Sequence, residues 1–141
     1  MQLKNEIGTL ILRVTLGALF LIHGIVKFQG GIENTVGWFS SIGIPGFMAY
    51  AVALIEIIGG VALIIGFATR YVSALYVLLM IGAIVKVKLS VGLLGNGQMA
   101  GYELDLAFLV ISVYLTMNDS KLLSIHQLFS QKNTDNVKKA A

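Results

Sequence analysis

Hydrophobic residues are gathered in four long stretches, separated by short polar or glycine-rich segments. A helix needs roughly 20 mostly apolar residues to cross the hydrocarbon core of a bilayer. The stretches reach or approach that length, and they cover residues 7–28, 46–68, 71–90 and 102–117. The pattern predicts an all-α membrane protein in which residues 1–129 form an antiparallel bundle of four transmembrane helices.

The segments outside these stretches predict shorter elements. Between the first two stretches, apolar side chains recur at helical spacing, which indicates a short amphipathic helix at the membrane interface. These residues are Ile32, Val36 and Phe39, with Trp38 beside them. Membrane anchoring is the favoured role of the Trp38–Phe39 pair, ahead of stacking on a ligand. Residues 122–129 predict another short interfacial helix, and residues 130–141 a polar, disordered tail.

The composition fits a chain surrounded by lipid. Hydrophobic residues make up 57% and charged residues 12%, whereas a soluble domain carries about 25% charged residues. The chain has no cysteine, which excludes disulfides, thiolate metal sites and iron–sulfur clusters built on it. We attribute the formal net charge of +3 to membrane orientation and contact with anionic lipid, and expect no nucleic-acid partner.

Lysine and arginine set the expected orientation, because they are enriched in the cytoplasmic loops of membrane proteins. If the N-terminus is cytoplasmic, the same side receives Lys4, Arg13, Arg70, Lys121, Lys132, Lys138 and Lys139. The other side receives Lys27, Lys86 and Lys88. The imbalance predicts that both termini are cytoplasmic. The first stretch is too long for a signal peptide and contains charged residues, so we expect it to remain as a helix.

Two charged residues lie well inside the predicted spans, Arg13 in the first and Glu56 near the middle of the second. A charge at the centre of a span costs about 2.5–3.5 kcal/mol on insertion scales, so each needs a partner or a function. On a helical projection, Arg13 shares one side with Gly17, Gly24 and Lys27. We expect this side to face the bundle and Arg13 to pair with Glu56, either as a structural ion pair or as part of a functional site.

Four more charged residues are expected at the outer end of the bundle. Lys86 and Lys88 end the third span, while Glu103 and Asp105 begin the fourth. Residues two apart point to opposite sides of a helix, so we expect only one of each pair to face inward and the other to reach the headgroups. Two inner faces are open for the fourth helix. One contains Glu103, Ala107, Val110 and Tyr114, and the other contains Asp105, Ser112 and Thr116.

The expected small-molecule site lies between the first two spans, in the outer half of the bundle, bounded by His23, Lys27 and Glu56. Histidine has an unperturbed pKa of ~6.5, which suits proton exchange near neutrality. In the alternative interpretation, close helix packing leaves no cavity, His23 is a hydrogen-bonded packing residue and the lysines are interfacial anchors. No metal site is expected, because the only other histidine is His126.

Several short motifs follow one another along nearly the whole chain. They are Arg13, Gly17, Leu21-Ile22-His23-Gly24 and Lys27, then Gly43-Ile44-Pro45, Glu56, Gly59-Gly60, Gly66-x-x-Thr69-Arg70 and Gly101-Tyr102-Glu103-Leu104. Together they resemble the DoxX family of small bacterial and archaeal membrane proteins. The chain departs from the family pattern near the end of the third span, where lysines replace a common histidine, and at Asn118-Asp119-Ser120.

The resemblance implies a four-helix membrane protein that is an oxidoreductase component. Some family members are similar to the membrane component of thiosulfate–quinone oxidoreductases, and others are associated with resistance to catechols, quinones, or oxidative and thiol stress. The bacillus-type catechol- and quinone-response members look closest. The implied ligand is a quinone, and the implied partner is a soluble oxidoreductase or dioxygenase. Small bundles often dimerise, so a homodimer is a further expectation.

Three functions are open from the sequence. The first is a quinone-interacting oxidoreductase component, with His23, Lys27 or Glu56 at the ring oxygens. The second is a small proton-coupled transporter that uses Glu56 to bind a proton or a cation. The third is a scaffold that recruits a soluble enzyme to the membrane through the basic tail or the turn around Arg70.

Overall fold

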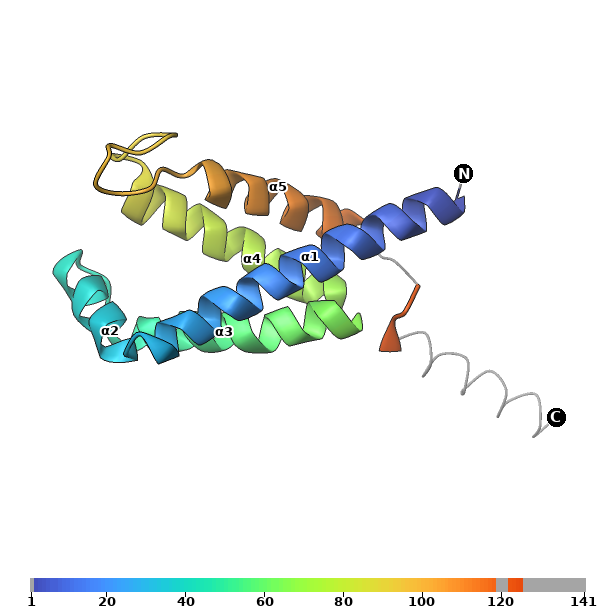
Figure 1. The fold of residues 1–141 in the computed structure, drawn as a ribbon, viewed down its shortest axis with the longest axis horizontal. Helices are drawn as coiled ribbons and strands as arrows, with labels where there is room; N and C mark the ends of the chain where they lie inside the picture. Colours follow the sequence, from blue (N-terminus) through green and yellow to red (C-terminus); the bar gives the residue numbers. More distant parts are fainter. Residues whose placement is uncertain (1, 119–121, 126–141) are drawn as a thin grey trace.

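The computed structural model describes residues 2–118 and 122–125, and within them the chain is helical (Figure 1). The helices are α1 (Gln2–Gln29), α2 (Ile32–Ser41), α3 (Phe47–Ile65), α4 (Thr69–Ala83) and α5 (Glu103–Met117), and α4 continues into a π-helical segment, η1 (Ile84–Lys88). The described residues contain no strand, only an isolated bridge between Gly95 and Ala100. The predicted tail at 130–141 and most of the predicted helix at 122–129 lie outside the described residues.

Three helices are long and apolar enough to cross a membrane in the part of the chain that the structure describes. They are α1, α3, and α4 together with η1. Helix α5 has 15 residues, which falls short of the length of a typical span. The structure therefore supports three of the four predicted spans by length and composition.

The main helices run roughly side by side along the long axis of the molecule, as two close pairs, α1 with α3 and α4 with α5 (Figure 1). The pairs are joined by a tight turn at residues 66–68, in which Gly66 and Ala68 have φ of 69° and 48°. This turn ends α3 earlier and starts α4 earlier than the sequence predicted. We call this the turn end of the bundle, and the opposite end, which carries α2, the α2 end.

Glycines set the close contact between α1 and α3. A Cβ atom added to Gly17 would lie 2.7 Å from the Gly60 carbonyl oxygen, and one added to Gly60 would lie 2.7 Å from the Gly17 carbonyl oxygen. Closer to the α2 end, Gly24 packs in the same way against Ala53 and Ile57. Backbones can approach this closely only where side chains are absent, so the register of α1 on α3 is fixed by these contacts.

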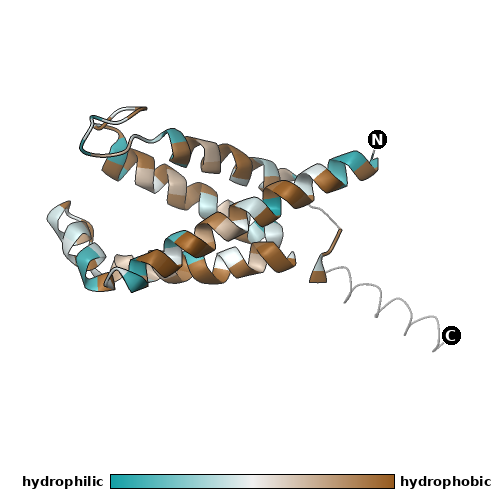
Figure 2. Ribbon diagram, viewed as in Figure 1, coloured by the Kyte–Doolittle hydropathy of each residue, from teal (hydrophilic) through white to brown (hydrophobic). Residues whose placement is uncertain are grey.

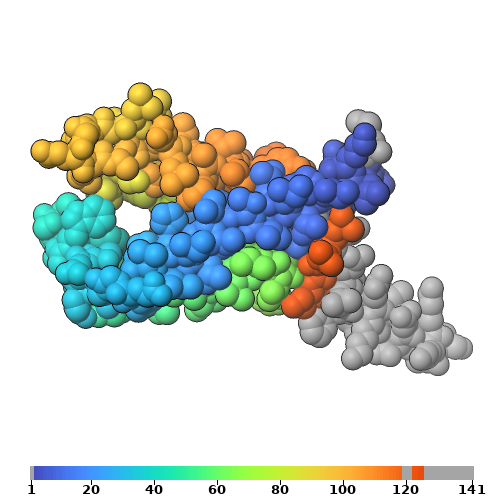
Figure 3. All heavy atoms as spheres, viewed as in Figure 1, coloured from blue at the N-terminus to red at the C-terminus, as the bar shows by residue number. Residues whose placement is uncertain are grey.

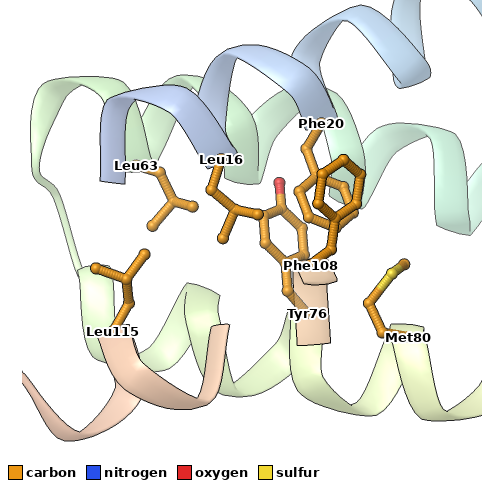
Figure 4. Packing of buried hydrophobic residues seen from close by; sticks show 7 residues of the cluster. All are labelled: Leu16, Phe20, Leu63, Tyr76, Met80, Phe108 and Leu115. Atoms are coloured by element: carbon orange, nitrogen blue, oxygen red, sulfur yellow. The ribbon is translucent and has the colours of Figure 1, made fainter. Parts of the chain in front are cut away.

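The core lies between the two helix pairs, and large apolar side chains also cover the outside. The buried cluster contains Leu16, Phe20, Leu63, Tyr76, Met80, Phe108 and Leu115 (Figure 4). On the outside, Phe47 is 69% and Tyr71 83% exposed, and hydrophobic residues predominate along the helices (Figure 2). Soluble monomers rarely expose so much continuous apolar surface, which agrees with a lipid-facing exterior.

The turn end is closed by a short segment that follows α5. Arg13 is fully buried and donates hydrogen bonds to the carbonyl oxygens of Leu122 and Leu123, at 3.2 and 3.0 Å. The Ser124 hydroxyl donates to the Gly66 carbonyl oxygen at 2.7 Å. Arg13 therefore holds the chain after α5 against the turn between α3 and α4.

Candidate ligand-binding site

A cavity of about 500 Å³ opens at the α2 end, between the two helix pairs. Figure 3 shows it as a gap between α2 and the loop that precedes α5. Helices α1 and α3 line one side, α4, η1 and α5 line the other, and Trp38 and Phe39 of α2 lie at the mouth. Its size is within the range of pockets that bind small organic molecules, about 300–1,000 Å³.

Aromatic rings close the inner end of the cavity. Phe20 of α1 and Phe108 of α5 line it, with ring centroids 5.3 Å apart. Behind them Tyr76 stacks on Phe20 at a centroid distance of 3.7 Å, and its hydroxyl donates to the Glu56 carbonyl oxygen at 3.1 Å. The cavity thus offers the faces and edges of rigid rings, against which a planar ligand can stack.

The first ion pair of the cavity joins α1 to α3. The Lys27 Nζ atom lies 2.6 Å from Glu56 Oε2, and the side chains are 24% and 7% exposed. The pair forms because Gly24, one turn before Lys27, lets α1 approach the backbone of α3 beside Glu56. Both side chains line the cavity.

The prediction that Arg13 is the partner of Glu56 is therefore wrong, and the helix register explains why. Gly17 lies opposite Gly60. Arg13 is four residues from Gly17 toward the turn end, and Glu56 is four residues from Gly60 toward the α2 end. At 1.5 Å per residue, the two helix positions are about 12 Å apart along the bundle, which is too far for a direct contact.

The second ion pair joins η1 to α5 on the other side of the cavity. The Lys88 Nζ atom lies 2.5 Å from Asp105 Oδ2, and both residues line the cavity. This resolves the choice between the two faces of α5, because Asp105, Phe108 and Ser112 point inward while Glu103 is exposed. Helical segments with π geometry occur often at functional sites, and η1 contributes three lining residues, Lys86, Val87 and Lys88.

Lys86 differs from the other two lysines of the cavity. It is exposed at the rim and makes no ion pair or hydrogen bond with the described residues. Lys88 is half-buried and paired with Asp105, whereas Lys86 is exposed, although both residues line the cavity. The long Lys86 side chain reaches the rim from a more exposed position on η1.

His23 lies between the two ion pairs. It lines the cavity from α1, and its ring meets Phe108 edge to face at a centroid distance of 6.1 Å. The structure thus brings together His23, Lys27 and Glu56, as the sequence indicated. It adds Lys86, Lys88 and Asp105 to them, and it leaves Arg13 and Glu103 outside the lining.

The aromatic part of the site was not predicted from the sequence. Phe20 lies on the same helix side as Arg13 and Lys27, and Phe108 follows Asp105 by three residues. Their spacing from these charged residues could therefore have predicted that both rings face the bundle interior. Trp38 and Phe39 were assigned to membrane anchoring, yet both line the mouth of the cavity.

Within the described residues, no three histidine or acidic side chains are grouped closely enough to hold a metal ion.

The arrangement suits a flat ring that carries oxygen atoms. Each lysine ammonium has three N–H donors. Lys27 uses one for Glu56 and one for the His23 carbonyl oxygen, at 3.5 Å, and Lys88 uses one for Asp105, so both retain at least one donor. They approach the cavity from opposite sides, with aromatic rings closing one end. Two ring oxygens could accept hydrogen bonds from these ammonium groups or from the His23 imidazole.

Comparison with known proteins gives matches over most of the chain. The family model described as DoxX matches residues 8–89. A relative in Bacillus subtilis, named "Putative oxidoreductase CatD", is 46% identical over 138 residues, which cover 97% of this chain and 98% of the relative.

Two further relatives carry membrane-protein names. "Inner membrane protein YqjF" of Escherichia coli is 36% identical over 70 residues, which cover 50% of this chain and 53% of that protein. "Uncharacterized membrane protein Rv3486" of Mycobacterium tuberculosis is 30% identical over 137 residues, which cover 90% of this chain and 84% of that protein. No solved structure matches the chain.

Proposed function

The chain belongs to the DoxX family, and from this premise we propose that it is a multi-pass cell-membrane protein that binds a quinone- or catechol-type ring as a component of an oxidoreductase system. The observation that carries the proposal is the cavity at the α2 end, which has aromatic rings at its inner end and a lysine–carboxylate pair on each side. The relative named "Putative oxidoreductase CatD" aligns with almost the full chain, and its name supports the reaction class.

The proposed topology has four crossings, with α5 as the fourth. Helices α4 and α5 are tied at both ends, because Arg70 Nε donates to the Thr116 carbonyl oxygen at 3.1 Å and Lys88 pairs with Asp105. Helix α5 therefore lies at the same depth as α4 and η1, which are together long enough to span. A short hydrophobic helix is accommodated by local thinning of the bilayer. The excess of lysine and arginine in the segments predicted to share a side with the N-terminus supports a topology in which both termini are cytoplasmic.

The residues of the cavity fit a quinone or catechol by size, shape and donor chemistry. Phe20 and Phe108 offer ring surfaces, and Lys27 and Lys88 offer charged donors to ring oxygens. Hydrogen bonds from charged donors are stronger than neutral ones. A bound quinone would supply the capacity to take up two electrons and two protons, while His23 is placed to hold or transfer a proton at a ring nitrogen and Glu56 holds the Lys27 ammonium at the cavity wall.

Electrons require a donor or acceptor beyond the cavity, and we propose that a soluble oxidoreductase or dioxygenase partner produces or consumes the ring compound. The transporter hypothesis fits the geometry less well. A carboxylate that binds a transported cation must be free to receive it, whereas the Glu56 carboxylate is already held by Lys27 at 2.6 Å. The scaffold hypothesis is the outcome if no ring binds.

Fluorescence of Trp38 tests the binding directly, because it is the only tryptophan and lines the cavity mouth. We expect 2-methyl-1,4-naphthoquinone to quench it saturably in detergent-purified protein. Gly82→Phe should abolish the saturable phase, since Gly82 lines the cavity and a Cβ atom added there would meet no atom within 4 Å, which leaves room for the ring to enter the site. Gly8→Phe is the matched control, because Gly8 is equally unobstructed on α1, away from the cavity. Equal, non-saturable quenching in all three proteins would show that the quinone only partitions into the micelle.

Resistance in cells tests the biological role. His23→Ala and Glu56→Gln should each remove protection against added quinone or catechol in a strain that depends on this protein, with protein levels unchanged on immunoblots. Normal resistance in both variants would contradict the proposed role of the cavity and favour a scaffold.

A further inference from the structure

We propose that the cavity takes its ring ligand as a monoanion and that Lys86 supplies the balancing charge; this rests on the proposed function and specifies the ligand class. The starting observation is the charge balance of the lining. Three lysines and two carboxylates line the cavity. The carboxylates of Glu56 and Asp105 are each paired, with Lys27 and Lys88 respectively.

Lys86 is the lysine left over. It lines the cavity without an ion pair or hydrogen bond to the described residues, so its ammonium is available to a ligand. His23 does not cancel this charge, because an imidazole is either neutral or positive. Glu103 does not cancel the charge either, because this acidic residue at the start of α5 is exposed and does not line the cavity. The cavity therefore carries a positive excess in either state of His23.

The apolar and aromatic walls of the cavity strengthen the attraction between this excess positive charge and an anionic ligand, because charges interact more strongly where water is partly excluded. A neutral ring would leave the Lys86 ammonium at the rim with water alone, whereas an ionised hydroxyl on the ring would give it a charged partner. An enolate or catecholate oxygen also accepts stronger hydrogen bonds from ammonium groups than a carbonyl does. The site is thus complementary to an ionised hydroxy-quinone or catecholate.

A matched pair of ligands tests the inference by Trp38 quenching. 2-Hydroxy-1,4-naphthoquinone is an anion at neutral pH, and 2-methyl-1,4-naphthoquinone has nearly the same shape and no charge. We expect the wild-type protein to bind the hydroxy compound about tenfold more tightly, the equivalent of one charged hydrogen bond. Lys86→Gln should bring the ratio of the two dissociation constants close to one, and Lys86→Arg should keep it.

Lys4→Gln is the control, because it removes the same charge from an exposed position of α1 outside the cavity. It should keep the wild-type ratio. A ratio near one in the wild type, or an unchanged ratio in Lys86→Gln, would overturn the charge inference while leaving the proposed function standing. Failure of both compounds to bind would overturn both proposals.

An anionic lipid headgroup offers the same chemistry to Lys86, and nanodiscs separate the two sources. The titrations are repeated in phosphatidylcholine nanodiscs with and without phosphatidylglycerol. If the ring anion is the partner of Lys86, the ratio stays the same in both. Loss of the preference on adding phosphatidylglycerol would show that a lipid phosphate occupies Lys86, and the proposal would be wrong.

Discussion

Removing either partner of the Lys27–Glu56 pair should destabilise the protein by different amounts. In Lys27→Met, the side chain keeps roughly its length but loses its charge. The Glu56 carboxylate, whose side chain is only 7% exposed, is then left without a cation. Breaking a buried pair in this way costs about 3–5 kcal/mol, and the 24% exposure of Lys27 places the expected cost near the lower end, at about 3 kcal/mol. In Glu56→Gln, Lys27 can extend toward the headgroups, so we expect a cost of about 1 kcal/mol.

The double variant separates pairing from other effects. In the double variant neither charge is present, so Lys27→Met no longer leaves a buried carboxylate without its cation. The double variant should therefore lower the free energy of unfolding by about 1–2 kcal/mol less than the sum of the two single variants. The assay is reversible unfolding in dodecyl maltoside–SDS mixtures, followed by circular dichroism. The control cycle combines Arg13→Met with Glu56→Gln, and it should be additive because the residues lie about 12 Å apart along the bundle. Additivity in the Lys27 cycle, or coupling in the Arg13 cycle, would refute the register of α1 on α3.

Three further predictions address packing, the turn end and topology. Gly60→Ala should cost about 1–3 kcal/mol in the same unfolding assay, because its Cβ would meet backbone of α1, whereas Gly8→Ala should be neutral or stabilising; equal effects would contradict the close approach. Arg13→Gln should loosen the segment after α5 and raise its hydrogen exchange, because Arg13 bonds two of its carbonyl oxygens, and unchanged protection would show that Arg13 does not hold it. Single cysteines at Gly95 and Asn133, in a chain without cysteine, should react from opposite sides of the membrane, and labelling from one side would overturn the topology.

Much of the helical framework followed from hydrophobic length alone. The first three spans and the short helix α2 were predicted near their observed positions, because apolar stretches and amphipathic spacing are local properties of the sequence. The family resemblance is confirmed by the match over residues 8–89. The π-helical segment η1 had no such signal, since its turns differ from α-helical ones by hydrogen bonding rather than by composition.

Pairings between helices depended on register, which the sequence does not specify. Arg13 and Glu56 both face the bundle as expected and are buried, yet the Gly17–Gly60 contact separates them and places Lys27 beside Glu56. The choice of Asp105 over Glu103 likewise depended on how α5 is rotated against η1. Helical projection showed which residues share a side, but only packing between helices decides which of those sides meet and at what height.

The most direct test of the central claim is a crystal structure of the protein with 2-bromo-1,4-naphthoquinone, in which bromine can be located by its anomalous signal. We expect one bromine peak inside the cavity, with ring oxygens within hydrogen-bonding distance of Lys27 or Lys88 and the ring against Phe20 or Phe108. A cavity filled by side chains, or bromine peaks only on the lipid-facing surface, would contradict the account.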